Sequence, residues 1–138
     1  EEGAGIDGKS FSLLPVEIFY RETGKTKKVT EYPCDGKLLK AAEQVKTKYH
    51  TCRGVIGSGD EWNNQLDRIA LFRERYHTAV EDMESAAAAQ LCLSYGVPFL
   101  GVRILSNSIV NGEKFDEAVG IDGQKFMLSL VDQMRDYM

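Results

Sequence analysis

Apolar and polar residues follow one another along the chain in blocks of two different spacings. Two extended segments, residues 13–20 and 27–32, flank Thr23-Gly24, a dipeptide typical of a tight turn. We expect these segments to form a β-hairpin. Residues 37–49 then place apolar side chains at helical spacing, which predicts an amphipathic helix.

From residue 54 onward, short apolar runs alternate with helical stretches. The runs lack polar alternation, which fits strands buried on both faces of a sheet. Strands are predicted at residues 54–57, 78–80 and 97–105, and helices at residues 64–75, 86–95 and 120–138. This order favours an α/β fold with a central, mostly parallel or mixed sheet flanked by helices. We expect residues 1–138 to form a single domain.

Polar turns follow directly on the carboxyl ends of the three predicted strands. Ser58-Gly59-Asp60 follows the first strand, Asp82-Met83-Glu84 the second, and Ser106-Asn107 the third. The carboxyl ends of parallel strands share one edge of an open α/β sheet, and ligands bind at that edge. The pattern therefore predicts that the three turns converge on a small-molecule site.

Each of these residues also has a purely structural interpretation. Glu84 falls in the first turn of a helix, where a carboxylate compensates the helix dipole. Met83 fits a core position, and Trp62 fits a residue that covers the edge of the sheet. Asn107 suits a turn in which its side chain hydrogen-bonds the backbone. Taken singly, these residues do not decide between a binding site and a structural role.

Taken together, the turns match the motifs of one enzyme family. Residues 80–87 (Val-Glu-Asp-Met-Glu-Ser-Ala-Ala) resemble the V-E-M-E-x-x-A motif of the methylthioadenosine/S-adenosylhomocysteine nucleosidases. Residues 54–60 are similar to the family's strand that ends in S-G-D, and residues 97–107 to its V-P-F-x-x-V-R-x-x-S-D segment. The resemblance implies a nucleoside phosphorylase-like fold, and the chain looks like the C-terminal part of that domain.

In this family the corresponding residues hold an adenine nucleoside while its N-glycosidic bond breaks. The resemblance implies that Glu84 binds the ribose hydroxyls near the developing positive charge and that Met83 packs on the sugar. It also implies that Trp62 stacks on the purine, that Asn63 contacts the base edge, and that Phe115 closes the alkylthio side. Asn107 and Glu84 fall at the catalytic positions. The implied substrate contacts are Ser58, Gly59, Asp60, Trp62, Asn63, Asp82, Met83, Glu84, Ser106 and Phe115.

Asn107 departs from the family pattern, because the nucleosidases carry a catalytic Asp at this position. An Asn amide donates a hydrogen bond to purine N7 but supplies no proton, and general acid catalysis is worth about 10²–10⁴-fold. Some purine nucleoside phosphorylases of the same superfamily use an Asn at the base, and non-catalytic members are known in plants. Three interpretations stay open: a nucleosidase, a purine nucleoside phosphorylase, and a non-catalytic nucleoside-binding or storage-type protein.

Composition and charge narrow the classes of partner. The chain of 138 residues has a net charge of −4 with both signs interspersed, so we expect no nucleic-acid partner. The short basic run at residues 25–28 is interpreted as a solvated loop or hairpin tip. No apolar run approaches the ~20 residues of a membrane span. His50 and His77 lack clustered carboxylates, so neither a metal site nor another cofactor is expected.

The resemblance also has implications beyond these residues. Relatives extend further at the N-terminus, where the residues that decide between hydrolysis and phosphorolysis lie, so we expect the full-length protein to complete the site. Relatives form homodimers or larger assemblies. Bacterial ones serve methionine salvage in the cytoplasm, whereas plant storage-type ones are secreted or vacuolar.

The sequence leaves open whether Cys34 and Cys52 form a disulfide, and Cys92 fits a buried helical position.

Overall fold

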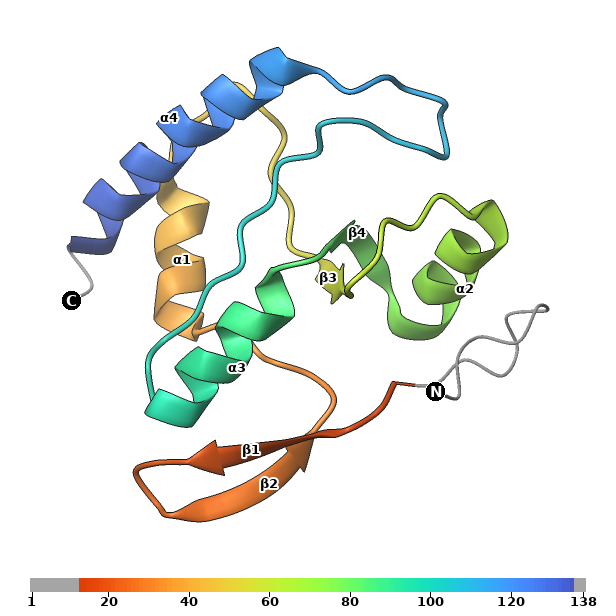
Figure 1. The fold of residues 1–138 in the computed structure, drawn as a ribbon. Coiled ribbons are helices and arrows are strands. Elements are labelled where there is room, and N and C mark those ends of the chain that lie inside the picture. The colour runs from red at the N-terminus through yellow and green to blue at the C-terminus, as the bar shows by residue number, and fades with distance from the viewer. Residues whose placement is uncertain (1–12, 136–138) are drawn as a thin grey trace. The chain divides into compact units, whose positions relative to one another are not determined.

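The computed structural model describes residues 13–135, which contain four helices and four strands (Figure 1). The strands form two separate sheets, each of two strands. The described chain divides into two compact units, which we call the first unit (residues 13–33 and 54–97) and the second unit (residues 34–53 and 98–135). Among the described residues, no helix has both the length and the apolar character needed to cross a membrane.

The first unit opens with the predicted antiparallel hairpin of β1 (Val16–Tyr20) and β2 (Lys25–Val29). Gly24 in the turn adopts φ +65°, a left-handed conformation that favours glycine. The basic run was expected at a loop or hairpin tip, but it lies within β2. Its side chains are exposed there, and the Lys28 ammonium pairs with the Glu17 carboxylate at 3.6 Å.

A parallel pair of strands forms the second sheet of this unit. The elements in order are β3 (Val55–Ser58), α2 (Leu66–Tyr76), β4 (Thr78–Asp82) and α3 (Ser85–Tyr95). β3 and β4 run parallel, as their sequence pattern predicts. α3 contacts β1 and β3, and α2 contacts β4. Ile18 of β1 and Ala89 of α3 are buried, so a thin apolar core joins the hairpin to α3.

Left-handed residues end both helices of the first unit. His77 ends α2 at φ 58° and Gly96 ends α3 at φ 68°. The prediction that Gly96 stops this helix is confirmed, since glycine adopts the left-handed conformation without a Cβ penalty. His77 is exposed at the end of α2, where it caps the helix.

The second unit is built on a pair of helices, α1 (Gly36–Gln44) and α4 (Glu117–Met134). Asp35 caps α1 by accepting hydrogen bonds from the N–H groups of Lys37 and Leu38 at 2.8 and 3.0 Å. Asp116 caps α4, which therefore begins before the expected residue 120. Residues 136–138, also predicted to be helical, lie outside the described residues. The buried apolar side chains of this unit are Leu38, Ala41, Val45 and Leu130.

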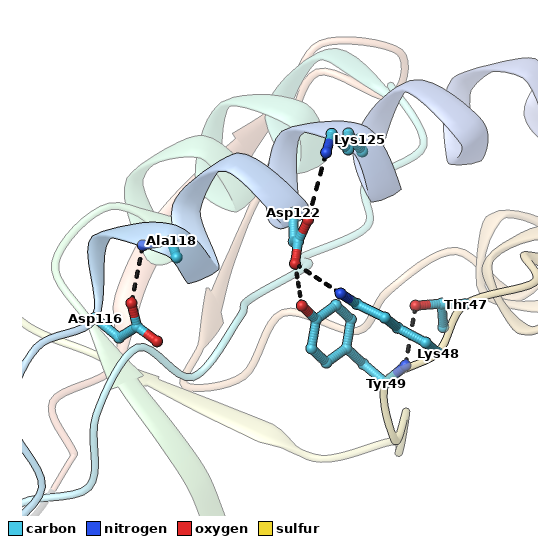
Figure 2. A network of polar contacts seen from close by, with 7 residues as sticks. All are labelled: Thr47, Lys48, Tyr49, Asp116, Ala118, Asp122 and Lys125. Carbon is cyan, nitrogen blue, oxygen red and sulfur yellow. Dashed lines mark hydrogen bonds and ion pairs between the residues drawn. The ribbon is translucent and has the colours of Figure 1, made fainter.

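α1 ends at Gln44, five residues before the predicted end at residue 49. The Thr47 hydroxyl accepts a hydrogen bond from the Tyr49 N–H at 3.2 Å, a local bond that competes with helical hydrogen bonding. The segment after α1 is instead held to α4 by the Asp122 cluster (Figure 2). In this cluster, Tyr49 donates a hydrogen bond to the Asp122 carboxylate, and Lys48 and Lys125 pair with it at 3.3 and 3.6 Å.

The structure corrects the prediction of a third strand at residues 97–105. This segment contains no strand, and Val97 and Leu105 are 53% and 60% exposed. A strand needs a neighbour for its N–H and C=O groups, but within residues 13–135 β3 and β4 pair only with each other. The Phe99 carbonyl instead accepts a hydrogen bond from the Asp35 N–H at 2.7 Å. The mixed α/β class is thus confirmed, with parallel pairing limited to β3 and β4 in the described residues.

The three cysteines are free thiols, so the open Cys34–Cys52 disulfide is absent. Cys34 and Cys52 are exposed. Cys92 is only half-buried on α3, less than its Ala-rich surroundings predicted.

Candidate functional site

The first two polar turns meet at the carboxyl end of the parallel sheet, as the sequence pattern predicts. Ser58 at the end of β3 lies opposite Asp82 at the end of β4. The Gly59 N–H donates a hydrogen bond to the Asp82 carbonyl at 3.0 Å, which carries the pairing one residue beyond β3. The segments 58–60 and 82–84 are therefore neighbours at one edge of the sheet.

The start of α3 is held by side chains from both strands. The Asp82 carboxylate accepts hydrogen bonds from the Ser85 N–H at 3.2 Å and from the Ser85 hydroxyl at 2.5 Å. The Ser58 hydroxyl accepts a hydrogen bond from the Ala86 N–H at 3.0 Å. We call this set, Ser58, Asp82 and Ser85, the α3 cap. Ser58 and Asp82, both predicted as site residues, thus hold the helix that begins beside the turns.

Glu84 occupies the N-cap position of α3, but its side chain makes no capping hydrogen bond. Its carboxylate accepts a hydrogen bond from the Met83 N–H at 3.3 Å. Glu84 is exposed and lies at the positive end of the helix dipole, which favours an anion there. Met83 is 46% exposed, so its interpretation as a core residue is wrong. Both side chains are accessible at the edge of the sheet.

The loop between β3 and α2 carries the predicted purine contacts. Trp62 is 69% exposed, so most of its side chain remains in contact with solvent rather than covering the sheet. Asn63 donates a hydrogen bond through Nδ2 to the Glu81 carboxylate at 2.9 Å, and its Oδ1 accepts one from the Gln65 N–H at 3.2 Å. Asn63 therefore anchors the loop to β4. Asp60, just before these residues, is exposed.

Ser106, Asn107 and Phe115 belong to the second unit. The Ser106 hydroxyl donates a hydrogen bond to Asn107 Oδ1 at 2.9 Å, and both residues are half-buried. This bond engages Oδ1, the acceptor end of the Asn107 amide. Phe115 is 67% exposed. The meeting of this third turn with the first two stays a prediction.

Ser85 stands at the centre of the α3 cap but is not among the site residues predicted from the sequence. Within residues 13–135, Ser85 is the one polar residue that is buried, at 8% exposure. Asp82 and Ser85 are three residues apart at a helix start, a spacing at which an Asp side chain caps a helix. That spacing is a signal by which the sequence alone could have identified Ser85.

Comparison with known proteins shows which family the chain resembles over most of its length. The sequence model of the Phosphorylase superfamily matches residues 10–134. The chain is 34% identical over 131 residues to the 5'-methylthioadenosine/S-adenosylhomocysteine nucleosidase of Bacillus pumilus (strain SAFR-032), covering 87% of this chain and 56% of that protein. It is 32% identical to the enzyme of the same name from Aeromonas salmonicida (strain A449), covering 86% and 54%. The chain spans about half the length of the curated relatives it matches.

Proposed function

Since this chain belongs to the Phosphorylase superfamily, we propose that it forms the nucleoside-binding part of a purine nucleosidase. In the whole protein it would cleave the N-glycosidic bond of 5'-methylthioadenosine or S-adenosylhomocysteine, the compounds named in its relatives. The observation that carries the proposal is the exposed Glu84 carboxylate, held where β4 meets α3 beside the end of β3.

Glu84 is suited to the charge that develops during this reaction. Cleavage of an N-glycosidic bond passes through a ribose with oxocarbenium character, and a nearby fixed anion stabilises that positive charge. In the proposed site, the Glu84 carboxylate accepts hydrogen bonds from the ribose hydroxyls. The exposed Met83 side chain packs against the sugar, and the exposed Trp62 ring stacks on the purine.

Asn107 takes the position next to the purine in this proposal. The Ser106 hydroxyl engages Asn107 Oδ1. In the proposed site, the Nδ2 group of Asn107 donates a hydrogen bond to purine N7. This amide holds the base without protonating it. Asn107 therefore favours a second candidate as well, a purine nucleoside phosphorylase or a non-catalytic nucleoside-binding protein.

We also propose that both units belong to one domain. One superfamily match runs through both units, which supports this proposal. Phe115 is proposed to contact the alkylthio group of the nucleoside. Assembly as a homodimer, a role in methionine salvage and a cytoplasmic location complete the proposal, supported by the similarity to bacterial nucleosidases.

The test is product analysis with the whole protein. Methylthioadenosine, S-adenosylhomocysteine and inosine are each incubated with and without phosphate, and released base and sugar are separated by chromatography. The proposal predicts adenine and free sugar without phosphate. A strict requirement for phosphate, with sugar 1-phosphate as product, would instead identify a phosphorylase. Binding of a nucleoside without release of any base would identify a non-catalytic protein.

A further inference from the structure

We infer that the α3 cap, formed by Ser58, Asp82 and Ser85, positions Glu84 for the ribose instead of contacting the nucleoside. This role rests on the proposed function, because it acts through the Glu84 carboxylate. It differs from the direct substrate contact that the family resemblance implies for Ser58 and Asp82.

The first reason is that side chains other than that of the N-cap residue cap the start of α3. A helix begins with N–H groups that lack helical partners, and the side chain of the N-cap residue commonly accepts from one of them. Glu84 is the N-cap residue of α3, yet its side chain accepts no capping bond. Asp82 accepts from the first helical N–H and Ser58 from the second. The first two N–H groups of α3 are therefore satisfied without the Glu84 carboxylate.

The second reason is the burial of Ser85. A buried hydroxyl costs free energy unless it is hydrogen-bonded, and the Ser85 hydroxyl donates to Asp82 at 2.5 Å. Both carboxylate oxygens of Asp82 therefore engage Ser85, one through its N–H and one through its hydroxyl. This paired contact fixes the Asp82 side chain against the helix rather than toward the exposed edge.

The third reason is the position of Glu84 within this arrangement. Asp82 and Ser85 flank residues 83 and 84 on either side, and the Gly59 N–H fixes the Asp82 carbonyl. The backbone that carries Glu84 is thus tied to β3 at one end and to α3 at the other. A catalytic group that shifts by about 1 Å can lose 10²-fold in rate, so such ties have catalytic value.

A double-mutant cycle tests this role in the whole protein, with adenine release from methylthioadenosine as the readout. Asp82→Ala is measured in the native background and in the Glu84→Ala background. If Asp82 acts through Glu84, we expect the substitution to lower kcat about tenfold in the first background, with a smaller change in KM, and less than twofold in the second. Ser85→Ala should show the same pattern, and Ser85→Thr, which keeps the hydroxyl, should restore most of kcat.

The matched control is Asp35→Ala. Asp35 caps α1 with two hydrogen bonds, so its removal reproduces the loss of a helix cap on a helix of the second unit. We expect a lower Tm and an unchanged kcat. If Asp82→Ala costs the same factor with and without Glu84, the positioning role is rejected while the proposed function stands. If the native protein neither binds methylthioadenosine nor releases adenine, the proposed function is rejected together with this role.

Discussion

The two units of the chain use polar side chains in different ways. In the first unit, Ser58 and Asp82 accept hydrogen bonds from backbone N–H groups at the start of a helix. In the second unit, the Asp122 cluster joins side chains to one another, Tyr49 and two lysines around a single carboxylate. The first arrangement fixes the backbone beside an exposed Glu84, whereas the second holds a loop segment to α4 (Figure 2).

This difference separates a candidate site from a structural contact that also contains charged residues. Exposed ion pairs contribute little to stability, because solvent screens them and ordering the side chains costs entropy. Backbone ties at the end of a strand instead determine where a neighbouring side chain lies. Charge and clustering alone would have favoured the Asp122 cluster, while geometry favours the ends of β3 and β4.

Asn107 of the second unit offers the largest expected effect, because an Asn at this position supplies no proton to the purine. We expect Asn107→Asp to raise the rate of adenine release by about 10²-fold or more, since an aspartic acid supplies the proton that an amide lacks. Steady-state kinetics with methylthioadenosine measures this change. Asn111→Asp, an exposed position nearby in sequence, is the control and should have no effect. An unchanged or lower rate would show that the site is adapted to Asn.

Substitution of Leu130 tests whether the buried face of α4 stabilises the fold. Leu130 is 1% exposed, and Leu128 on the same helix is 70% exposed. We expect Leu130→Ala to lower the free energy of unfolding by about 2–5 kcal/mol, and Leu128→Ala to change it by less than about 0.5 kcal/mol. Chemical denaturation of both variants measures the difference. Equal effects would mean that α4 is not packed as the structure shows.

Substitution of Asp122 is expected to have the smallest effect on stability, and the size of that effect should depend on pH. The hydrogen bond from Tyr49 and the ion pair with Lys48 lower the pKa of Asp122 from its ordinary value of 3.8. A carboxylate with a lowered folded pKa stabilises the fold above its unfolded pKa, and this contribution is lost as the pH falls through the folded value. Asp122→Asn should therefore lower Tm near neutral pH, and the difference from the native protein should shrink as the pH falls below 3.8 and through the lowered folded pKa of Asp122.

Two controls ensure that the Tm difference between the native protein and Asp122→Asn reports on Asp122 itself. The Arg53 side chain lowers the pKa of Glu43 as well, but this contact is present in both proteins and cancels in the difference. Asp132→Asn removes an exposed carboxylate from the same helix and is the control. A difference in Tm that persists unchanged at low pH would contradict an ionic contribution from Asp122.

The sequence predicted local elements well because their signals are local. The Thr23-Gly24 turn, the Gly96 helix end and the parallel β3–β4 pair all follow from short patterns around them. The strand at residues 97–105 failed because an apolar run shows only that a segment avoids water. Whether it becomes a strand depends on a hydrogen-bonding neighbour elsewhere in the chain.

For the candidate site, the sequence predicted where the turns lie but not how their side chains meet. Motif spacing located the first two turns, and their pairing at the sheet edge is confirmed. The burial of Ser85 and the hydrogen bond between Asn63 and Glu81 depend on how side chains meet across elements, which no spacing rule specifies. The roles of Glu84 and Asn107 toward a nucleoside stay predictions.

Calorimetric titration of the whole protein with methylthioadenosine, before and after Glu84→Ala, tests the central claim most directly. Glu74→Ala, which removes an exposed carboxylate from α2, is the matched control. We predict saturable binding by the native protein and the control, and a loss of about tenfold or more in affinity with Glu84→Ala, because hydrogen bonds to a charged group contribute about 1.5–3 kcal/mol. Equal affinity of all three proteins would contradict a nucleoside site at the junction of β4 and α3.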